Sequence, residues 1–319
     1  MVNRICISHR KDVDGLSSAA LIKAAIGCKV ILSDYDDLKD RLSSVGEFDE
    51  LYLCDMGLNL DVADKILQYA KNRPMNSIHY IDHHTLDPSI LKKIREAGID
   101  VTHSEDESTS VLTYQKFCKV LPKKAELLAA YGAITDYMDL QPIARKIIQG
   151  YDRQFILLEA TLLSYALARS DDEFLLKLVD HLSEFRYPHQ IPSLIDRAIE
   201  QAEYIAELIV KIEMNGKRMK NFAYMEVKES ITGNIAHFLI GVFDVPIGVV
   251  YRVFKDRGVF EVSLRGSSEC RHHLGMIASR IANKLGGFGG GHPRASGAQI
   301  PLEKLNDFLQ LLDQELSRS

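Results

Sequence analysis

The stretch RICISHRKDVDGLSSAALIKAAIG, residues 4–27, contains the pattern that decides the fold. A short apolar run ends at a histidine, a polar turn follows, and an apolar stretch of helical length begins at Gly15. The same succession of apolar run, turn and helical stretch recurs through residues 1–103. Unbroken apolar strands that alternate with helices indicate a parallel sheet covered by helices on both faces. We therefore predict an α/β fold for this part of the chain.

Nearly every apolar run in this region ends in a histidine or an aspartate. These residues are His9, Asp34, Asp55, Asp82 and His103. Ligands of an open parallel sheet bind beyond the carboxyl ends of its strands. The sequence therefore predicts a polar site at one edge of the sheet.

The sequence of the rest of the chain predicts helices, followed by a second, smaller α/β unit. Amphipathic spacing indicates helices between about residues 109 and 214. Further elements are expected in the order strands 221–227, 246–254 and 259–266, helix 274–286, a glycine-rich loop, strand 296–300 and a terminal helix opened by Pro301. A chain of 319 residues exceeds the usual size of one domain. We divide it into a first domain (1–185), a helical linker (186–218) and a second domain (219–319) across a cleft.

Composition limits the classes of function. The formal net charge of −5 argues against a protein that holds long nucleic acid by its total charge, so an anionic substrate must be bound by local groups. The longest apolar run, residues 237–252, is interrupted by Asp244 and Pro246 and is not expected to span a membrane. The N-terminus has no long apolar segment of a secretory signal, and the five cysteines are scattered. We expect a cytoplasmic protein without disulfides or zinc.

The motif HRKDVDG, residues 9–15, places His9, Asp12 and Asp14 at the end of the first predicted strand. Closely spaced carboxylates with an imidazole suit a hard divalent ion such as Mn²⁺ or Mg²⁺. The same aspartates could instead cap the helix that follows. Taken alone, this motif leaves both interpretations open.

Other strand ends favour the metal interpretation. Asp55 ends the third apolar run, Asp82, His83 and His84 end the fourth in IHYIDHH, and Asp136 follows an apolar helical segment. An unpaired carboxylate in apolar surroundings is costly, so cations are expected to neutralise this group. Two divalent metals about 3.5–4 Å apart can clamp the oxygens of a phosphoryl displacement and supply a hydroxide near neutral pH. The pattern therefore favours hydrolysis of a phosphate ester.

The segment GGFGGGHPRASG, residues 286–297, contains five glycines within six residues. The absence of side chains lets backbone N–H groups approach an anion closely. A flexible linker is the alternative, but His292, Arg294 and a predicted strand follow at once. We favour phosphate binding by Gly289, Gly290, Gly291, His292 and Arg294. His272 and His273 in CRHHLG lack a preceding carboxylate, and we interpret them as surface or substrate-side residues.

The motifs HRKDVDG, LCDMG, IDHH and AITDYMD occur in this order and resemble the four metal-binding motifs of the DHH phosphoesterase superfamily. SLRGS (263–267) and GFGGGHPRASGAQ (287–299) are similar to the associated C-terminal domain of its RecJ-like branch. The resemblance reaches both ends of the chain. It implies a DHH catalytic domain followed by a DHH-associated substrate-binding domain.

The resemblance also implies roles for individual residues. The first of two Mn²⁺ ions, with Mg²⁺ as the alternative metal, would be held by His9 and Asp12. The second would be held by Asp14, His83 and Asp136, and Asp55 would bridge the two. His84 would contact the scissile phosphate, and Asp82 would orient a histidine ring. Arg265 would bind a terminal phosphate or the nucleotide, and His292 would contact a substrate phosphate across the cleft.

The leading hypothesis is a compact enzyme of the nano-RNase and pAp-phosphatase type. It would hydrolyse short oligonucleotides, nucleotide phosphates such as 3′-phosphoadenosine 5′-phosphate (pAp), or both, by a two-metal hydroxide mechanism. A RecJ-like exonuclease specific for single strands is the enzymatic alternative, although such enzymes usually carry a further oligonucleotide-binding domain. A nucleotide-binding protein without catalysis is the alternative of another class, but it would be expected to have lost metal ligands. Dimers are common in this superfamily, so a homodimer is an expected assembly.

Overall fold

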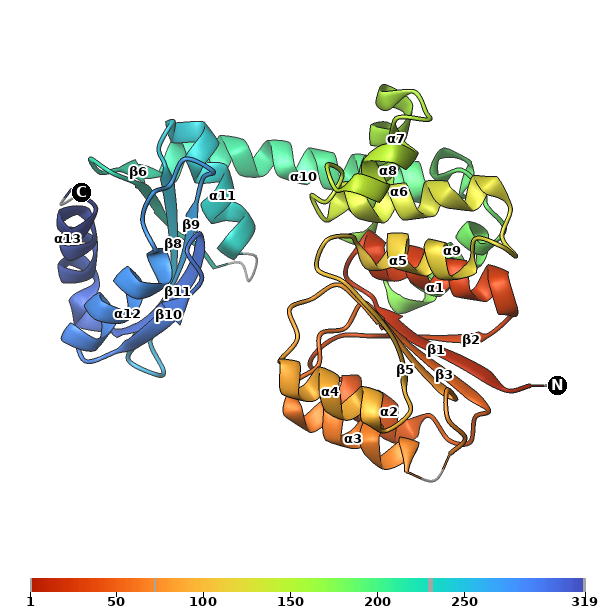
Figure 1. The fold of residues 1–319 in the computed structure, drawn as a ribbon. Coiled ribbons are helices and arrows are strands. Elements are labelled where there is room, and N and C mark those ends of the chain that lie inside the picture. The colour runs from red at the N-terminus through yellow and green to blue at the C-terminus, as the bar shows by residue number, and fades with distance from the viewer. Residues whose placement is uncertain (1, 72, 229–231, 318–319) are drawn as a thin grey trace. The chain divides into compact units, whose positions relative to one another are not determined.

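The computed structural model describes residues 2–71, 73–228 and 232–317. The chain forms two compact units, Met1–Ala202 and Glu203–Ser319. Their boundary lies within one long helix, α10 (Leu194–Asn215), and inside the segment expected to be the linker. Each unit has its own sheet and its own core (Figure 1).

The first unit is built on a five-stranded sheet in the order β2-β1-β3-β4-β5, and every pair of neighbours is parallel. The strands are β1 (Arg4–His9), β2 (Lys29–Ser33), β3 (Glu50–Cys54), β4 (Ile78–Asp82) and β5 (Asp100–His103). Their positions agree with the predicted apolar runs. All five carboxyl ends therefore lie along one edge, as the sequence predicted.

Helices cover both faces of this sheet (Figure 1), which confirms the predicted architecture. One face carries α2 (Leu38–Ser44), α3 (Leu60–Ala70) and α4 (Pro88–Glu96). The helices of the other core are α1 (Val13–Ile26), α5 (Thr109–Phe117), α6 (Glu126–Thr135), α7 (Pro142–Ile148), α8 (Arg153–Leu167) and α9 (Asp172–Ser183). Alternation along β1 explains the two cores, because Ile5 and Ile7 face α2–α4 whereas Cys6 faces the larger helical layer.

The second unit contains a six-stranded sheet in the order β10-β11-β9-β8-β7-β6, and its one parallel pair is β7 with β8. The strands are β6 (Lys217–Arg218), β7 (Ala223–Glu226), β8 (Ile247–Phe254), β9 (Val259–Gly266), β10 (Phe288–Gly291) and β11 (Ala295–Pro301). Helices α12 (Leu274–Lys284) and α13 (Leu305–Leu316) pack in one core, and α11 (Thr232–Phe243) packs in another. The terminal helix begins four residues after Pro301, because a short 3₁₀ turn (Leu302–Lys304) intervenes.

The prediction of a glycine-rich loop is wrong for most of the segment, because Phe288, Gly289, Gly290 and Gly291 form strand β10. The physical reason is close backbone packing. A methyl group on Gly287 would overlap the carbonyl oxygen of Gln299, and one on Gly289 would lie 3.0 Å from the carbonyl oxygen of Ala278 in α12. The glycines therefore let β10 pack closely between β11 and α12.

Among the residues that the structure describes, there is no helix with both the length and the apolar character needed to cross a membrane.

Candidate metal and phosphate site

Histidine and aspartate side chains gather at the carboxyl edge of the first sheet. Ligand atoms within 4.8 Å of one another form three overlapping groups, and Asp55 belongs to each of them. The groups are His9 with Asp12 and Asp55, then Asp14 with Asp55, His83 and Asp136, and finally Asp55 with His83 and His84. The structure thus brings together all six residues predicted as metal ligands.

The first group lies where β1 passes into α1. The Nδ1 atom of His9 lies 2.5 Å from Oδ2 of Asp12 and 3.8 Å from Oδ2 of Asp55. The other carboxylate oxygen of Asp12 accepts the backbone N–H of Gly15 at 2.8 Å and so caps α1. The capping interpretation of this motif is therefore confirmed for Oδ1 of Asp12, and Oδ2 faces His9, so the geometry is compatible with the metal interpretation as well.

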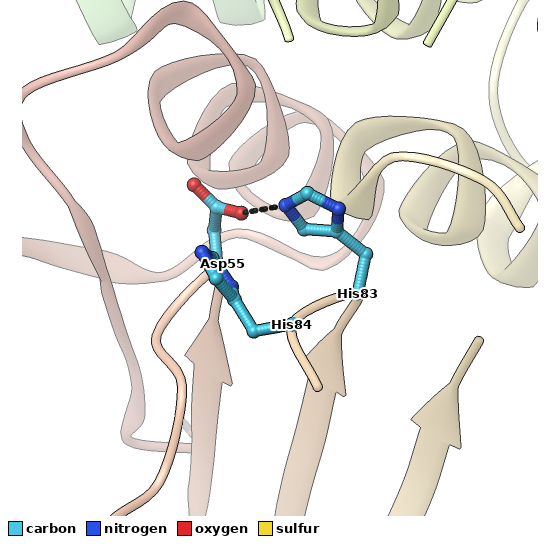
Figure 2. A group of neighbouring side chains, drawn as sticks. All are labelled: Asp55, His83 and His84. Carbon is cyan, nitrogen blue, oxygen red and sulfur yellow. Dashed lines mark ion pairs between the residues drawn. The ribbon is translucent and has the colours of Figure 1, made fainter. Parts of the chain in front are cut away.

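The second group is held by the start of α5 and the end of α6. Asp14 is fully buried, and its two oxygens accept the backbone N–H groups of Thr109 (2.7 Å) and Ser110 (3.0 Å). The Nε2 atom of His83 lies 3.2 Å from Oδ2 of Asp136 and 3.5 Å from Oδ1 of Asp55. Figure 2 shows the His83 ring beside the Asp55 carboxylate.

Asp55 is the residue common to these groups, and its backbone is unusual. It adopts a φ of 58°, in the left-handed region that residues other than glycine seldom occupy, although aspartate and asparagine do so more often than most. Its side chain is fully buried, and Oδ1 accepts the hydroxyl of Thr109 at 2.9 Å. This backbone conformation aims a buried carboxylate at the side chains of both neighbouring motifs.

Several features show that these residues fit divalent cations. Within the described part of the chain, Oδ2 of Asp55 and Nε2 of His9 are buried without a hydrogen-bond partner. Burial, followed by the charges of Asp12 and Asp14, raises the pKa of Asp55 well above its ordinary value. Burial, with the charges of Asp14 and Asp12, also raises the pKa of Asp136 to about 8. Bound cations would occupy the unpartnered atoms and remove the repulsion that raises these pKa values.

We expect the stability of the metal-free protein to fall as pH rises from about 5.5 to 8.5. In this range the folded protein keeps a proton on Asp136 that the unfolded chain, with a carboxyl pKa near 3.8, has released. The folded state then binds more protons than the unfolded state, so the free energy of unfolding decreases with pH. Thermal unfolding in EDTA across this range measures the slope.

Two controls test this assignment. Asp136→Asn should reduce the pH dependence, because one of the two carboxyls with a raised pKa is gone, and added Mn²⁺ should raise the Tm of the native protein more at pH 8.5 than at pH 5.5. Equal pH slopes for Asp136→Asn and the native protein would contradict the assignment of the titration to this site.

A hydrogen-bonded chain lies beside the metal-ligand groups. Buried Asp82 accepts the ring Nδ1–H of His84 at 2.9 Å through Oδ1, and its Oδ2 accepts the hydroxyl of Tyr80 at 2.6 Å. The hydrogen bond to Asp82 raises the pKa of His84 above its ordinary value, in opposition to burial. Asp82 therefore orients the ring of His84, the predicted phosphate contact.

Tyr35 completes this chain and was missed by the sequence analysis. Its hydroxyl lies 3.1 Å from Nε2 of His84, and the N–H of Gly57 donates to the same hydroxyl at 3.4 Å. Tyr35 follows Asp34 at the end of β2, the second strand whose carboxyl end reaches this edge. The sequence did contain a signal for Tyr35: it directly follows Asp34, an aspartate at a strand end, and therefore lies at the predicted edge of the sheet.

The residues predicted to bind substrate lie in the second unit. Gly289, Gly290 and Gly291 belong to β10, and His292 and Arg294 are exposed in its connection to β11. Arg265, near the end of β9, pairs with Ala295 directly after this connection. The structure thus brings Arg265 beside the β10–β11 connection.

The guanidinium of Arg265 packs closely against the first turn of α11. A methyl group on Gly233 would lie 2.6 Å from Nη2 of Arg265. Burial lowers the pKa of this guanidinium. His273, in contrast, has a structural role, because its Nδ1 accepts the N–H of Met276 at 3.2 Å and caps α12.

Comparison with known families gives a match over much of the second unit. Residues 219–318 match the model of the DHHA1 domain. The second unit therefore contains a DHHA1 domain. The predicted DHH-associated C-terminal domain is confirmed by this match, and it follows the unit that carries the IDHH motif.

The similarity to solved structures extends over nearly the whole length of the chain. The pGpG-specific phosphodiesterase PggH from Vibrio cholerae is 16% identical, with a TM-score of 0.65 and 99% of each chain covered. An exonuclease RecJ bound to manganese is 15% identical, with a TM-score of 0.64 and coverage of 99% of this chain and 90% of that one. RecJ from Thermus thermophilus in complex with Mn²⁺ is 16% identical, with a TM-score of 0.58, and the match covers 99% of this chain and 52% of that one. The chain thus has the fold of these phosphodiesterases and exonucleases.

A curated relative matches a shorter segment. An uncharacterized protein from Methanocaldococcus jannaschii is 33% identical over 115 residues, which is 35% of this chain. The matched part of the chain spans only about a quarter (26%) of the length of that relative.

Proposed function

We propose that this chain is a phosphoesterase that depends on divalent metals and hydrolyses short oligonucleotides, nucleotide phosphates such as pAp, or both. The observation that carries the proposal is Asp55, a buried carboxylate in a left-handed backbone conformation that belongs to all three candidate ligand groups. Such a carboxylate is suited to bridge two Mn²⁺ ions. The similarity in fold to a pGpG-specific phosphodiesterase and to exonuclease RecJ supports the same chemistry.

The proposed metal sites use the side chains as the structure groups them. His9 and Asp12 would hold one ion, and a second set, consisting of Asp14, His83 and Asp136, would hold the other. Bound divalent ions lower the pKa of water and neutralise charge on a phosphate, which makes water a nucleophile near neutral pH. Thr109 and Ser110 fix the inner carboxylates, since they donate to Asp55 and Asp14.

His84 is proposed to donate a hydrogen bond to the scissile phosphate. Asp82 holds its ring through Nδ1, so Nε2 is the atom turned toward Tyr35 and available to exchange partners with a phosphate oxygen. The raised pKa of His84 favours the cationic ring, which binds a phosphate anion more strongly than the neutral ring does. In the second unit, Arg265 and the residues Gly289–Arg294 remain the proposed substrate-binding group.

A panel of substrates tests this function. Purified protein with Mn²⁺ is incubated with pAp, pGpG, RNA of two to ten nucleotides, long single-stranded DNA and pyrophosphate. We expect hydrolysis of the nucleotides and short RNA to exceed that of the long DNA, because the chain has a net charge of −5 and must bind its substrate through local groups. Preferential cleavage of long DNA would favour the second candidate, a single-strand exonuclease, which the RecJ-like fold supports.

A nucleotide-binding protein without catalysis would bind these compounds and hydrolyse none of them. The intact ligand groups argue against it, because His9, Asp14 and Asp136 have no evident use in a protein that only binds nucleotides. Assembly as a homodimer remains a prediction, and sedimentation equilibrium would test it.

A further inference from the structure

On an exposed face of the second sheet, the large aromatic ring of Phe288 lies beside glycine residues of β10 and β11, which have no side chains. Phe288 of β10 is 65% exposed. Successive side chains of a strand point to opposite faces of the sheet. A side chain at position 289 would point toward α12, so Phe288 and Gly290 face away from that helix. A methyl group on Gly290 would meet no atom within 4 Å, so this part of the face is open.

The neighbouring strands extend this bare surface. Gly290 pairs with Gly297 of β11, and Phe288 pairs with Gln299. Gln299 in turn pairs with Glu261 of β9. The surface forms an open hollow of about 330 Å³, with Phe288 at one side and the polar side chains of Gln299 and Glu261 on its border.

We propose that this hollow binds a nucleobase, with the base stacked on the ring of Phe288. The inference deepens the proposed function and rests on it for the identity of the ligand as part of a nucleotide. It adds a recognition site for the base to residues that were predicted only to bind phosphate.

Shape and chemistry support a flat, partly polar ligand. The glycine pair leaves backbone exposed beside the phenyl ring, so a planar ring system can contact both without a clash from a Cβ atom. Stacking of a base on an aromatic side chain contributes about 1–3 kcal/mol and tolerates any base. The amide of Gln299 and the carboxylate of Glu261 add hydrogen-bonding groups that suit the edge of a base.

Glu261 is held in place by its own ion pairs. Arg257 donates to Oε1 at 2.7 Å, and Arg252 donates to Oε2 at 3.3 Å. Gln299 lies 3.5 Å from the same carboxylate. The border of the hollow is therefore ordered before a ligand binds, which lowers the entropy lost on binding.

The sequence offers a direct spectroscopic test, because the chain contains no tryptophan. The full-length Phe288→Trp variant carries a single tryptophan at the proposed stacking position. It is titrated in EDTA with AMP, GMP, ribose 5-phosphate and inorganic phosphate. We expect saturable quenching of fluorescence by the nucleotides and none by ribose 5-phosphate or inorganic phosphate.

A matched variant controls for nonspecific quenching. Met214 is also exposed, at 78%, but it lies near the end of α10 and does not line the hollow. Met214→Trp should show no saturable quenching by any of these compounds. Equal quenching of both variants, or quenching of Phe288→Trp by ribose 5-phosphate, would overturn the proposal.

A second experiment measures the affinity of the protein for a nucleotide directly and needs no introduced tryptophan. Equilibrium dialysis of labelled pGpG in EDTA should show about tenfold weaker binding to Phe288→Ala and nearly native binding to Phe288→Tyr. If Phe288→Ala lowers only the Tm, the ring covers the glycines for stability, and the proposal fails. Binding of an apolar peptide in place of nucleotides would also overturn it.

The inference and the proposed function can fail separately. If nucleotides quench the fluorescence but the protein hydrolyses no member of the substrate panel, the base-binding site is supported and the proposed hydrolase function is refuted. Hydrolysis with unchanged pGpG affinity in Phe288→Ala would do the reverse.

Discussion

Asp55→Asn is expected to reduce Mn²⁺-dependent hydrolysis by on the order of 10³-fold, a loss comparable with removal of a main electrostatic group from other active sites. The change removes one negative charge and one oxygen of the proposed metal ligand but almost no volume. Asparagine tolerates the φ of 58° at this position, and its amide oxygen can still accept the hydroxyl of Thr109. The loss should therefore come from the metal site and not from the fold.

The same variant should gain stability in the absence of metal. Burial and the neighbouring charges of Asp12 and Asp14 raise the pKa of Asp55, which means that its ionised form is destabilised in the folded protein. An uncharged amide removes that repulsion, so we expect a higher Tm in EDTA for Asp55→Asn than for the native protein. Mn²⁺ should then stabilise the native protein more than the variant.

Asp64→Asn is the matched control, because Asp64 lies exposed in α3, away from the ligand groups. It should leave both hydrolysis and metal-dependent stabilisation unchanged. Full hydrolytic activity of Asp55→Asn would contradict the two-metal mechanism. Isothermal titration with Mn²⁺ would show whether the variant still binds two ions.

Gly132→Ala is expected to damage both stability and activity through a contact that the sequence does not reveal. Gly132 lies in α6, and a methyl group there would overlap Oγ of Ser110 and Oδ1 of Asp14. Forcing an extra carbon into a packed interior costs about 1–3 kcal/mol. The better helix propensity of alanine recovers at most about 1 kcal/mol of this cost.

The overlap falls on the hydrogen bonds that hold Asp14. Asp14 accepts the N–H groups of Thr109 and Ser110, so displacement of either partner moves a predicted metal ligand. We expect weaker Mn²⁺ binding as well as a lower urea midpoint for the first unit. Isothermal titration and urea unfolding measure the two effects independently.

Gly241→Ala makes the same chemical change as Gly132→Ala, but we expect it to stabilise the protein instead of destabilising it. Gly241 is exposed within α11, and a methyl group there would meet no atom within 4 Å. It should stabilise the protein by about 0.5–1 kcal/mol and leave hydrolysis unchanged. If Gly132→Ala behaved like Gly241→Ala, the close packing of α6 on Asp14 would be refuted.

Local patterns in the sequence were sufficient for the elements and for the edge at which the site forms. The apolar run ending at His9 and the run ending at Asp82 became β1 and β4, and the rule for parallel sheets placed their polar ends together. The same rule located Asp55 directly after β3. Resemblance to the DHH motifs then supplied the division of these residues between two metals.

The glycine segment shows where local reasoning failed. Five glycines within six residues favoured a loop because glycine disfavours regular strands. The structure forms β10 there because backbone atoms of β11 and α12 lie too close for side chains at Gly287 and Gly289. That constraint comes from the packing of the neighbouring strand and of a helix on another layer, so composition could not reveal it.

By itself, the sequence determined the order of strands and helices, the family motifs, and the edge of the sheet where acidic and histidine side chains meet, because these follow from periodicity and from the direction of each strand. Only the tertiary structure decided the strand order β2-β1-β3-β4-β5 and the partners that fix each side chain. Tyr35 reaches His84 across 49 residues, and Thr109 reaches Asp14 across 95. Such pairs form because helices and strands pack in three dimensions, and no local pattern in the sequence records which distant residue will be the partner.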